Sequence, residues 1–180
     1  SLHDALPIFM VGIESGSEEI LKNIKKGITK DQARTFMKSC RKLGILTHAT
    51  FSVGLPGETK KTIQETIDFA KELDPDTIQV SIATPYPGTE LYEEALQKGW
   101  LMNPDLVSTS GVQQASLQYK DITKEEIFAA VESIYSKFFF RPRPILRILR
   151  TMLTDKEMCK RRLREAKEFF SFMHSRKKKA

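Results

Sequence analysis

The chain has 180 residues, of which 40% are hydrophobic and 29% charged, and its formal net charge is +6. This size and composition are ordinary for a globular protein of one domain or one and a half. No run of about eighteen apolar residues occurs, so no membrane-spanning helix is predicted. Residues 141–180 hold fourteen Lys and Arg against four Asp and Glu, so the basic character belongs to the C-terminal part alone.

The two cysteines, Cys40 and Cys159, lie far apart and form no CxxC pair. Their spacing therefore predicts no metal site. Two isolated thiols favour a reducing compartment, and we expect a cytoplasmic protein.

Residues 1–8, Ser-Leu-His-Asp-Ala-Leu-Pro-Ile, are similar to the translation of a common sequencing adapter. We therefore expect this segment to be artificial and the part of the natural protein that precedes Phe9 to be missing. The alternative is a short natural lead-in to a strand.

Residues 9–14 are typical of a short strand, with Gly12 and Glu14 on one face and apolar residues on the other. Gly16 and Ser17 follow, and Ser17 is expected to cap a helix that runs to about residue 26. A carboxylate at the end of a strand, such as that of Glu14, can accept hydrogen bonds from a ribose or an amino group. The alternative is a solvated loop charge or a partner for a lysine.

Thr29 and Gln32 have the spacing of a capping box and predict the start of the next helix. One stripe of this helix is apolar, and Gly44 is expected to end it. Cys40 lies on the stripe and is interpreted as a core residue rather than a ligand. The stripe contains Ala33, Phe36, Met37, Cys40 and Leu43.

A second strand is predicted over residues 46–54, with Phe51 and Val53 on one face. The other face carries His48, Thr50 and Ser52. The loop at residues 54–57 contains two glycines, which let backbone approach a ligand, and Thr59 offers a cap for a helix over about 60–73. A plain hairpin or strand–helix turn without a ligand is the alternative.

A third strand follows, in which Ile78, Val80 and Ile82 alternate with Gln79, Ser81 and Ala83. A proline-rich loop at residues 84–88 and a short helix over 91–98 complete this unit.

Three strand–helix units in succession predict an α/β fold with a parallel sheet. Each strand keeps one face polar or small, whereas the strands of an open sheet buried on both faces are apolar throughout. The pattern therefore favours a barrel, or part of one, whose interior holds a ligand. Three strands cannot close a barrel, so we expect the second half of something larger. We divide the chain into residues 9–103, the partial barrel, and residues 104–180, an irregular segment with a basic helical extension.

The extension is predicted to contain a helix begun by Thr123 and Glu126, a second over residues 145–153 and a third over about 156–174. Its charge leaves three interpretations open. The helices form a solvated accessory bundle, touch an anionic membrane, or bind nucleic acid, although no nucleic-acid motif accompanies the charge.

Three motifs together resemble the fourth to sixth barrel strands of radical S-adenosylmethionine (SAM) enzymes, particularly the branch with a cobalamin-binding domain that includes the anaerobic magnesium-protoporphyrin ester cyclases. They lie at residues 12–17, 54–59 and 84–91. Further segments resemble the hopanoid-biosynthesis-associated radical SAM proteins of the J type, at residues 99–101, 111–113, 138–141 and 161–165. The resemblance implies the C-terminal half of a partial (β/α)6 TIM-like barrel.

The resemblance also implies site residues. SAM would be contacted by Glu14, Gly16, Ser17, Thr50, Ser52 and Gly54. Ser52 stands where many relatives carry an aliphatic residue. The parity of the strands adds substrate-side candidates, which are His48, Gln79, Ser81 and Tyr86.

A parent enzyme of this kind would use a [4Fe–4S] cluster, and cobalamin in this branch, to cleave SAM to a 5′-deoxyadenosyl radical. Its expected substrate is a lipid-linked sugar, namely a hopanoid headgroup that undergoes ring contraction to a cyclitol ether, and its electron donor a flavodoxin or ferredoxin. The alternatives are a methyltransferase or a tetrapyrrole cyclase of the same branch, or a non-catalytic binding module with a membrane-adhesive tail.

The CxxxCxxC motif that binds the cluster does not occur in this sequence, nor does a cobalamin domain. We therefore expect a fragment that is inactive by itself, with no metal site of its own. Peripheral contact with the inner face of the membrane, through residues 141–180, is expected to accompany the cytoplasmic location.

Overall fold

The computed structural model describes residues 8–102, 116–154, 160 and 164. The chain forms two compact units, Ser1–Phe138 and Phe139–Ala180, which are described separately. The predicted division after residue 103 stays a prediction.

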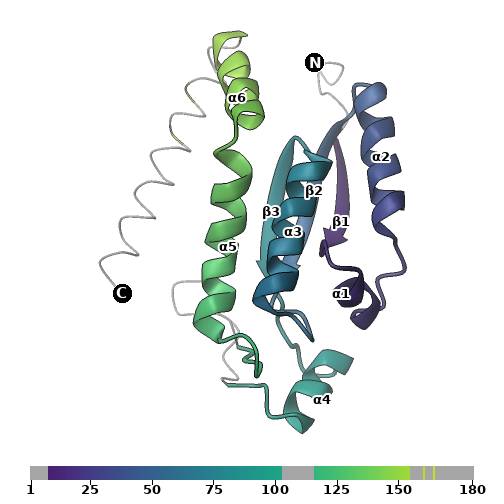
Figure 1. Ribbon diagram of the computed structural model, residues 1–180, viewed down its shortest axis with the longest axis vertical. Coiled ribbons are helices and arrows are strands. Elements are labelled where there is room, and N and C mark those ends of the chain that lie inside the picture. Colours follow the sequence, from purple (N-terminus) through teal and green to yellow (C-terminus); the bar gives the residue numbers. More distant parts are fainter. Residues whose placement is uncertain (1–7, 103–115, 155–159, 161–163, 165–180) are drawn as a thin grey trace. The chain divides into compact units, whose positions relative to one another are not determined.

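The first unit alternates strands and helices, as predicted for an α/β fold (Figure 1). Its strands are β1 (Ile8–Glu14), β2 (Leu46–Val53) and β3 (Thr77–Ile82). Its helices are α1 (Glu18–Asn23), α2 (Lys30–Lys42), α3 (Lys60–Leu73), α4 (Glu90–Gln97) and α5 (Lys124–Phe139), whose last residue belongs to the second unit.

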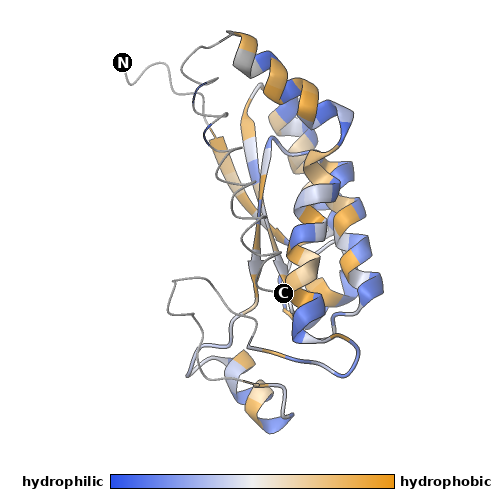
Figure 2. Ribbon diagram, turned by 90° about the vertical axis from the view of Figure 1, so that its left-hand side faces the viewer, coloured by the Kyte–Doolittle hydropathy of each residue, from blue (hydrophilic) through white to orange (hydrophobic). Residues whose placement is uncertain are grey.

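The three strands form one parallel sheet in the order β1-β2-β3. Figure 2 shows the described helices of this unit that run beside the strands on one side of the sheet. Sequential strand order with helices on one side is the arrangement of a barrel wall, whereas a doubly wound sheet is covered on both sides. The partial-barrel prediction is therefore confirmed.

Alternate residues of the strands form the core against the helices. Ala49, Phe51 and Val53 of β2 are fully buried, and Ile13 of β1 is nearly so. Their neighbours in sequence are only half-buried, which confirms the two predicted faces of β2. Cys40 is 3% exposed, so its assignment to the core is also confirmed.

Leu43 departs from the predicted stripe, because its side chain is 71% exposed. Helix α2 ends at Lys42, and Leu43 is its C-cap residue with a backbone that has left the helical region. A residue beyond the last turn no longer follows the helical period, so Leu43 does not share the buried face of Cys40.

The predicted helix starts are confirmed for three helices. Thr29 forms a capping box with Gln32, and Thr59 forms one with Thr62. At the start of α5, the Thr123 amide donates to the Glu126 carboxylate, and the Thr123 hydroxyl accepts from the Glu126 amide.

Helix α1 corrects the prediction at both ends. The Ser17 side chain makes no capping hydrogen bond, and the helix ends at Asn23 rather than near Lys26. Lys25 has a positive φ of 53°, and the Lys26 amide donates back to the Leu21 carbonyl at 3.0 Å. This turn reverses the chain after one and a half turns of helix and brings Lys26 towards the sheet.

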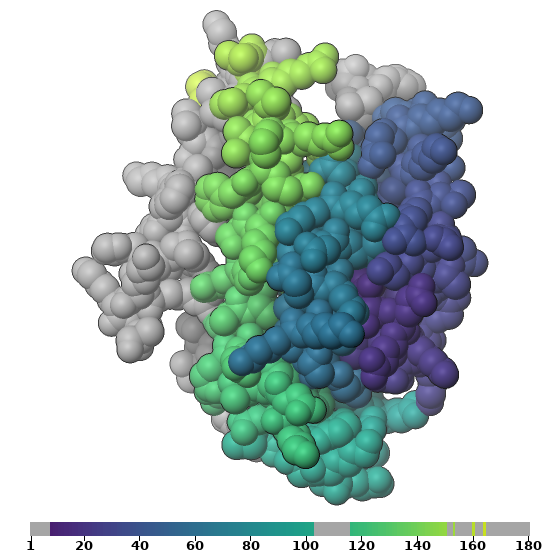
Figure 3. Space-filling model, in the orientation of Figure 1, coloured from purple at the N-terminus to yellow at the C-terminus, as the bar shows by residue number. Residues whose placement is uncertain are grey.

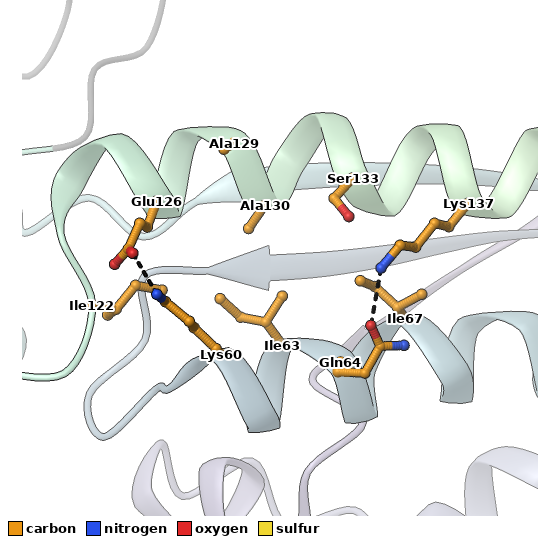
Figure 4. Close-up of a pocket in the computed structure, with 10 residues that line it drawn as sticks. All are labelled: Lys60, Ile63, Gln64, Ile67, Ile122, Glu126, Ala129, Ala130, Ser133 and Lys137. Atoms are coloured by element: carbon orange, nitrogen blue, oxygen red, sulfur yellow. Dashed lines mark hydrogen bonds and ion pairs between the residues drawn. The ribbon is translucent and has the colours of Figure 1, made fainter.

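Helix α3 lies between α5 and α2 on the outer surface of the unit (Figure 3). A shallow groove between α3 and α5 is lined by apolar residues, with a polar bridge at either end (Figure 4). Lys60 pairs with Glu126 at 2.7 Å, and Lys137 donates to Gln64 at 3.0 Å. The bridges and the groove's apolar floor attach α5 to the barrel unit.

The second unit contains α6 (Pro142–Thr154). The sequence predicted a helix only over residues 145–153, with the prolines before it as a break. Helix α6 instead begins at Pro142, since proline is well suited to the first position of a helix, where its missing N–H has no partner to lose. The predicted helix over 156–174, with Cys159, lies outside the described residues, apart from residues 160 and 164.

None of the described helices combines the length and the apolar content that a bilayer crossing requires.

Candidate functional site

The side of the sheet opposite the core carries an aligned set of polar residues. Pairing in the parallel sheet sets Gly12 beside Thr50 and Thr50 beside Gln79. One pleat further on, Ser52 lies beside Ser81. Apart from the exposed Gln79, these residues are half-buried, so a polar surface of limited access runs across all three strands.

Glu14 lies at the carboxyl end of β1, where the pairing with β2 is irregular between Gly12 and Glu14. Its φ of 65° is in the left-handed region, which turns the backbone out of the strand. Its Oε2 accepts a hydrogen bond from the Ser52 hydroxyl at 2.8 Å, and its Oε1 lies 2.9 Å from the Lys26 Nζ. The alternative interpretation of Glu14, as the partner of a lysine, is therefore realised.

Gly12 makes room for this ion pair. A Cβ at Gly12 would lie 2.6 Å from the Glu14 Oε1 and 2.9 Å from the Lys26 Nζ. The side chains of Glu14 and Lys26 are 23% and 30% exposed. Glu14 thus retains access from one side, and each carboxylate oxygen has a second lone pair for another donor.

The turn after β1 is held on helix α3 by buried hydroxyl groups. The Thr66 Oγ1 accepts from the Gly16 amide at 2.9 Å and pairs with the Ser15 Oγ at 3.1 Å. The Ser15 Oγ accepts in turn from the Ser17 amide at 3.1 Å. Gly16 and Ser17 therefore pack against α3, and their predicted contact with SAM stays a prediction.

The loop after β2 is held by Glu58, which is 1% exposed. The Glu58 Oε2 accepts from the Gly54 amide at 2.6 Å and from the Leu55 amide at 3.3 Å. Burial raises the pKa of the Glu58 carboxyl to about 7, although the two backbone donors act in the opposite direction. The Glu58 Oε1 is buried and has no hydrogen-bond partner among the described residues.

Tyr119 reaches the same loop from beyond the barrel units. Its hydroxyl donates to the Gly54 carbonyl at 2.8 Å, and its ring meets that of Trp100 edge-on, with centroids 4.9 Å apart. Burial raises the pKa of the Tyr119 hydroxyl, and the nearby Glu58 raises it further, so the group stays a donor at neutral pH.

The substrate-side candidates do not all lie together. His48 is near the start of β2, four residues before Ser52, which is about 13 Å along a strand. The His48 Nδ1 is 2.7 Å from the Thr77 hydroxyl. Gln79 and Ser81 share the polar face of β3, whereas Tyr86 is in the loop that follows and is 56% exposed. Their roles stay predictions.

Similarities in sequence and in fold connect this chain to known proteins. Residues 2–70 match the family model described as the Radical SAM superfamily. A Pyrococcus horikoshii protein named as an uncharacterized methyltransferase is 37% identical over 76% of this chain and 29% of its own length. The anaerobic magnesium-protoporphyrin IX monomethyl ester cyclase of Rubrivivax gelatinosus is 32% identical over 47% of this chain and 15% of the cyclase.

The match over residues 2–70 and the similarity to these relatives support a place for the chain in the radical SAM superfamily. The cytidylyl-2-hydroxyethylphosphonate methyltransferase of Streptomyces wedmorensis is a further relative, 31% identical over 49% of this chain and 18% of that enzyme. Enzymes among the relatives support an enzyme as the parent protein.

A solved radical SAM enzyme, the Escherichia coli coproporphyrinogen III oxidase HemN, shares the fold. It aligns with a TM-score of 0.50 and 15% identity, over 77% of this chain and 27% of the oxidase. This chain spans less than a third of the length of each of these four proteins.

The residues that the structure describes do not fit an iron–sulfur cluster. Such a cluster is held by several cysteine thiolates, and Cys40 is buried in the core, away from the polar face. Among the residues that the structure describes, no group of three His, Cys, Asp or Glu side chains could hold a metal ion. What the described residues offer instead is the polar face of the sheet and the loops at its edge.

The sequence patterns did not identify three residues that hold Glu14 and the loop after β2, namely Lys26, Glu58 and Tyr119. Glu58 was part of a recognised motif, and a carboxylate four residues after Gly54 was a usable signal for a loop cap. Lys26 and Tyr119 had no signal in the local pattern, because each reaches its partner through the tertiary fold.

Proposed function

We propose that this chain forms the SAM-binding wall of a radical SAM enzyme. The observation that carries the proposal is the hydrogen bond between Ser52 and Glu14, which joins the carboxyl ends of two adjacent parallel strands on the face opposite the described helices of this unit. Ligands of α/β proteins bind at this end of the strands, where the connecting loops can surround them.

The polar groups suit the adenosine part of SAM. The Glu14 carboxylate can accept hydrogen bonds from ribose hydroxyls or an amino group, and the hydroxyls of Thr50 and Ser52 can donate or accept. Gly54, with a φ of 78°, takes a backbone conformation that L side chains rarely adopt, and so lets the chain turn directly after β2.

We also propose that the parent enzyme belongs to the cobalamin-type branch, with its cluster bound by residues that this chain lacks. Relatives named as methyltransferases and as an ester cyclase favour those activities over a hopanoid ring contraction. The hopanoid headgroup remains a hypothesis, which rests on the resemblance of residues 138–141 and the other C-terminal segments.

A lipid-linked substrate would give the basic extension a role at an anionic membrane. Helix α6 exposes Leu146, Leu149 and Leu153 to 64%, 48% and 88%, and arginines alternate with these apolar residues. Basic amphipathic helices of this composition lie in the interface of anionic bilayers. Replacing Arg143, Arg147 and Arg150 with glutamine should weaken sedimentation with phosphatidylglycerol vesicles, and unchanged sedimentation would contradict the contact.

Titration of the 180-residue chain with SAM, followed by NMR, tests the proposed wall. We expect shifts at the amides around Glu14 and Ser52, and Ser52→Ala should weaken binding by roughly 3- to 10-fold, the usual effect of one lost hydrogen bond. Ser39→Ala is the matched control, since Ser39 is exposed on α2. No binding, or shifts confined to other surfaces, would disprove the proposal.

A further inference from the structure

The backbone amide and the backbone carbonyl of Gly54 are both held by buried side chains. Its amide donates to the Glu58 Oε2 at 2.6 Å, and its carbonyl accepts from the Tyr119 hydroxyl at 2.8 Å. Glu58 is 1% exposed and Tyr119 is 8% exposed. Few loop residues have both backbone groups satisfied by side chains, because loops usually leave one or both to water.

The two holding residues come from different parts of the chain. Glu58 immediately precedes the cap of α3, whereas Tyr119 follows the last helix of the barrel units by more than twenty residues. Tyr119 is itself fixed, because its amide donates to the Ile122 carbonyl at 3.1 Å and its ring contacts Trp100.

Helix α5 packs against Gly54 as well. A Cβ placed on Gly54 would lie 3.2 Å from the Ile127 Cγ2, and Ile127 is fully buried. The loop therefore packs against a side chain of α5 at the same residue that Tyr119 and Glu58 hold. A displacement of Gly54 would leave at least one buried polar group without a partner.

We propose that Glu58 and Tyr119 are positioning residues for the ligand at the end of β2, so that the segment from Tyr119 to α5 supports the SAM site from outside it. This inference rests on the proposed function. Neither side chain needs to touch the ligand, since both act through Gly54, which lies two residues after Ser52.

The expected consequence is a ligand site whose affinity depends on residues outside the three barrel units. Ser52 can donate to Glu14 only while β2 keeps its register up to its last residue, Val53. Gly54 follows directly, so its position fixes the end of the strand. If the Tyr119 hydroxyl is lost, the Gly54 carbonyl keeps no partner, and the end of β2 should open more often.

Tyr119→Phe in the 180-residue chain tests the inference, because it removes the hydroxyl and keeps the ring against Trp100. We expect hydrogen exchange at the Gly54 amide to accelerate about tenfold, and SAM affinity to fall roughly 3- to 10-fold. Tyr92→Phe on α4 and Tyr135→Phe on α5 are matched controls. The Tyr135 hydroxyl accepts from the Val80 amide on β3, so this control removes a hydroxyl that packs elsewhere on the sheet.

Glu58 variants provide the second measurement. Glu58→Gln keeps an oxygen that can accept from the Gly54 amide, whereas Glu58→Ala keeps none. We expect the glutamine variant to retain slow exchange at Gly54 and most of the SAM affinity, and the alanine variant to lose both. Urea unfolding of each variant separates a local opening of the loop from a loss of the whole fold.

The results distinguish the two proposals. Unchanged Gly54 exchange and SAM affinity in Tyr119→Phe would overturn the positioning role, even if the unmodified chain binds SAM. Equal changes in Tyr119→Phe and Tyr135→Phe would also overturn it, because they would report general destabilisation. Absence of SAM binding in the unmodified chain would disprove the proposed function, and exchange at Gly54 would still decide whether Tyr119 holds the loop.

Discussion

Two glycine turns at the same edge of the sheet are stabilised in different ways. The turn at residues 15–17 is held by Thr66, a residue of α3 that packs directly beneath it. The loop at residues 54–57 is held by Glu58, the residue that follows it, and by Tyr119, which is 65 residues away in sequence from Gly54. Both turns belong to motifs that resemble the same family.

The difference lies in what replaces the backbone partners that a strand loses at its end. Neutral hydroxyls serve the first turn and require close contact, which only glycine at position 16 permits. A buried carboxyl serves the second, and this choice makes the loop after β2 sensitive to pH. Close packing therefore stabilises the first turn, whereas hydrogen bonds to a buried, ionisable carboxyl stabilise the second.

The largest expected effect concerns the carboxyl of Glu58. Its pKa in the folded protein, about 7, exceeds its ordinary value of 4.5, so the folded state holds a proton that the unfolded state has already lost. The contribution of Glu58 to stability is therefore greatest below pH 4.5 and falls as the pH rises to about 7, by about 3 kcal/mol at 1.36 kcal/mol per pKa unit.

Urea unfolding of the unmodified chain and of Glu58→Gln, between pH 4.5 and 8, measures this loss. Glutamine does not ionise, so the variant should lack the fall in this window. The same fall in both chains would contradict the electrostatic account. The lowered pKa values of Asp68, Glu72 and Glu126 act at lower pH and in the opposite sense, so they do not obscure the comparison.

Gly16→Ala should have the next largest effect. The added Cβ would lie 2.5 Å from the Glu65 carbonyl oxygen and 2.6 Å from the Thr66 Cα, and backbone atoms can yield only if α3 shifts. We expect a loss of about 2 to 3 kcal/mol in the free energy of unfolding, measured by urea denaturation.

Gly57→Ala is the control from the other turn. Gly57 has a φ of 84°, but its nearest contact is the Asn23 Nδ2, the movable end of an exposed side chain. Only the backbone conformation should be penalised, at about 1 kcal/mol. If the two variants lose equal stability, close packing is not what distinguishes the first turn.

Thr66→Val should have the smallest of these effects. Valine keeps the shape but removes the oxygen that accepts from the Gly16 amide, and leaves that buried donor without a partner. We expect a loss of about 1 to 2 kcal/mol in the free energy of unfolding, whereas Thr35→Val, at an exposed position on α2, should change it by less than about 0.5 kcal/mol. Equal losses would show that the hydroxyl contributes nothing specific.

The sequence predicted the parts of the fold that depend on local periodicity. The alternation in β2 identified Phe51 and Val53 as core and Thr50 and Ser52 as the polar face, because strand residues must alternate between faces. It also placed Glu14 at the end of β1 with a lysine as a possible partner. It missed the early end of α1, because the reversal at Lys25 depends on a positive φ that lysine rarely adopts.

Local sequence patterns were enough to predict the three strand–helix units, the caps at Thr29, Thr59 and Thr123, the polar face and the resemblance to radical SAM enzymes, since each depends on residues close together in the chain. Only the packing of separate elements decided that Lys26 pairs with Glu14 and that Tyr119 completes the loop after β2. These contacts depend on how separate elements pack in three dimensions. No local pattern records them, because the free energy that favours each contact comes from burying both partners together.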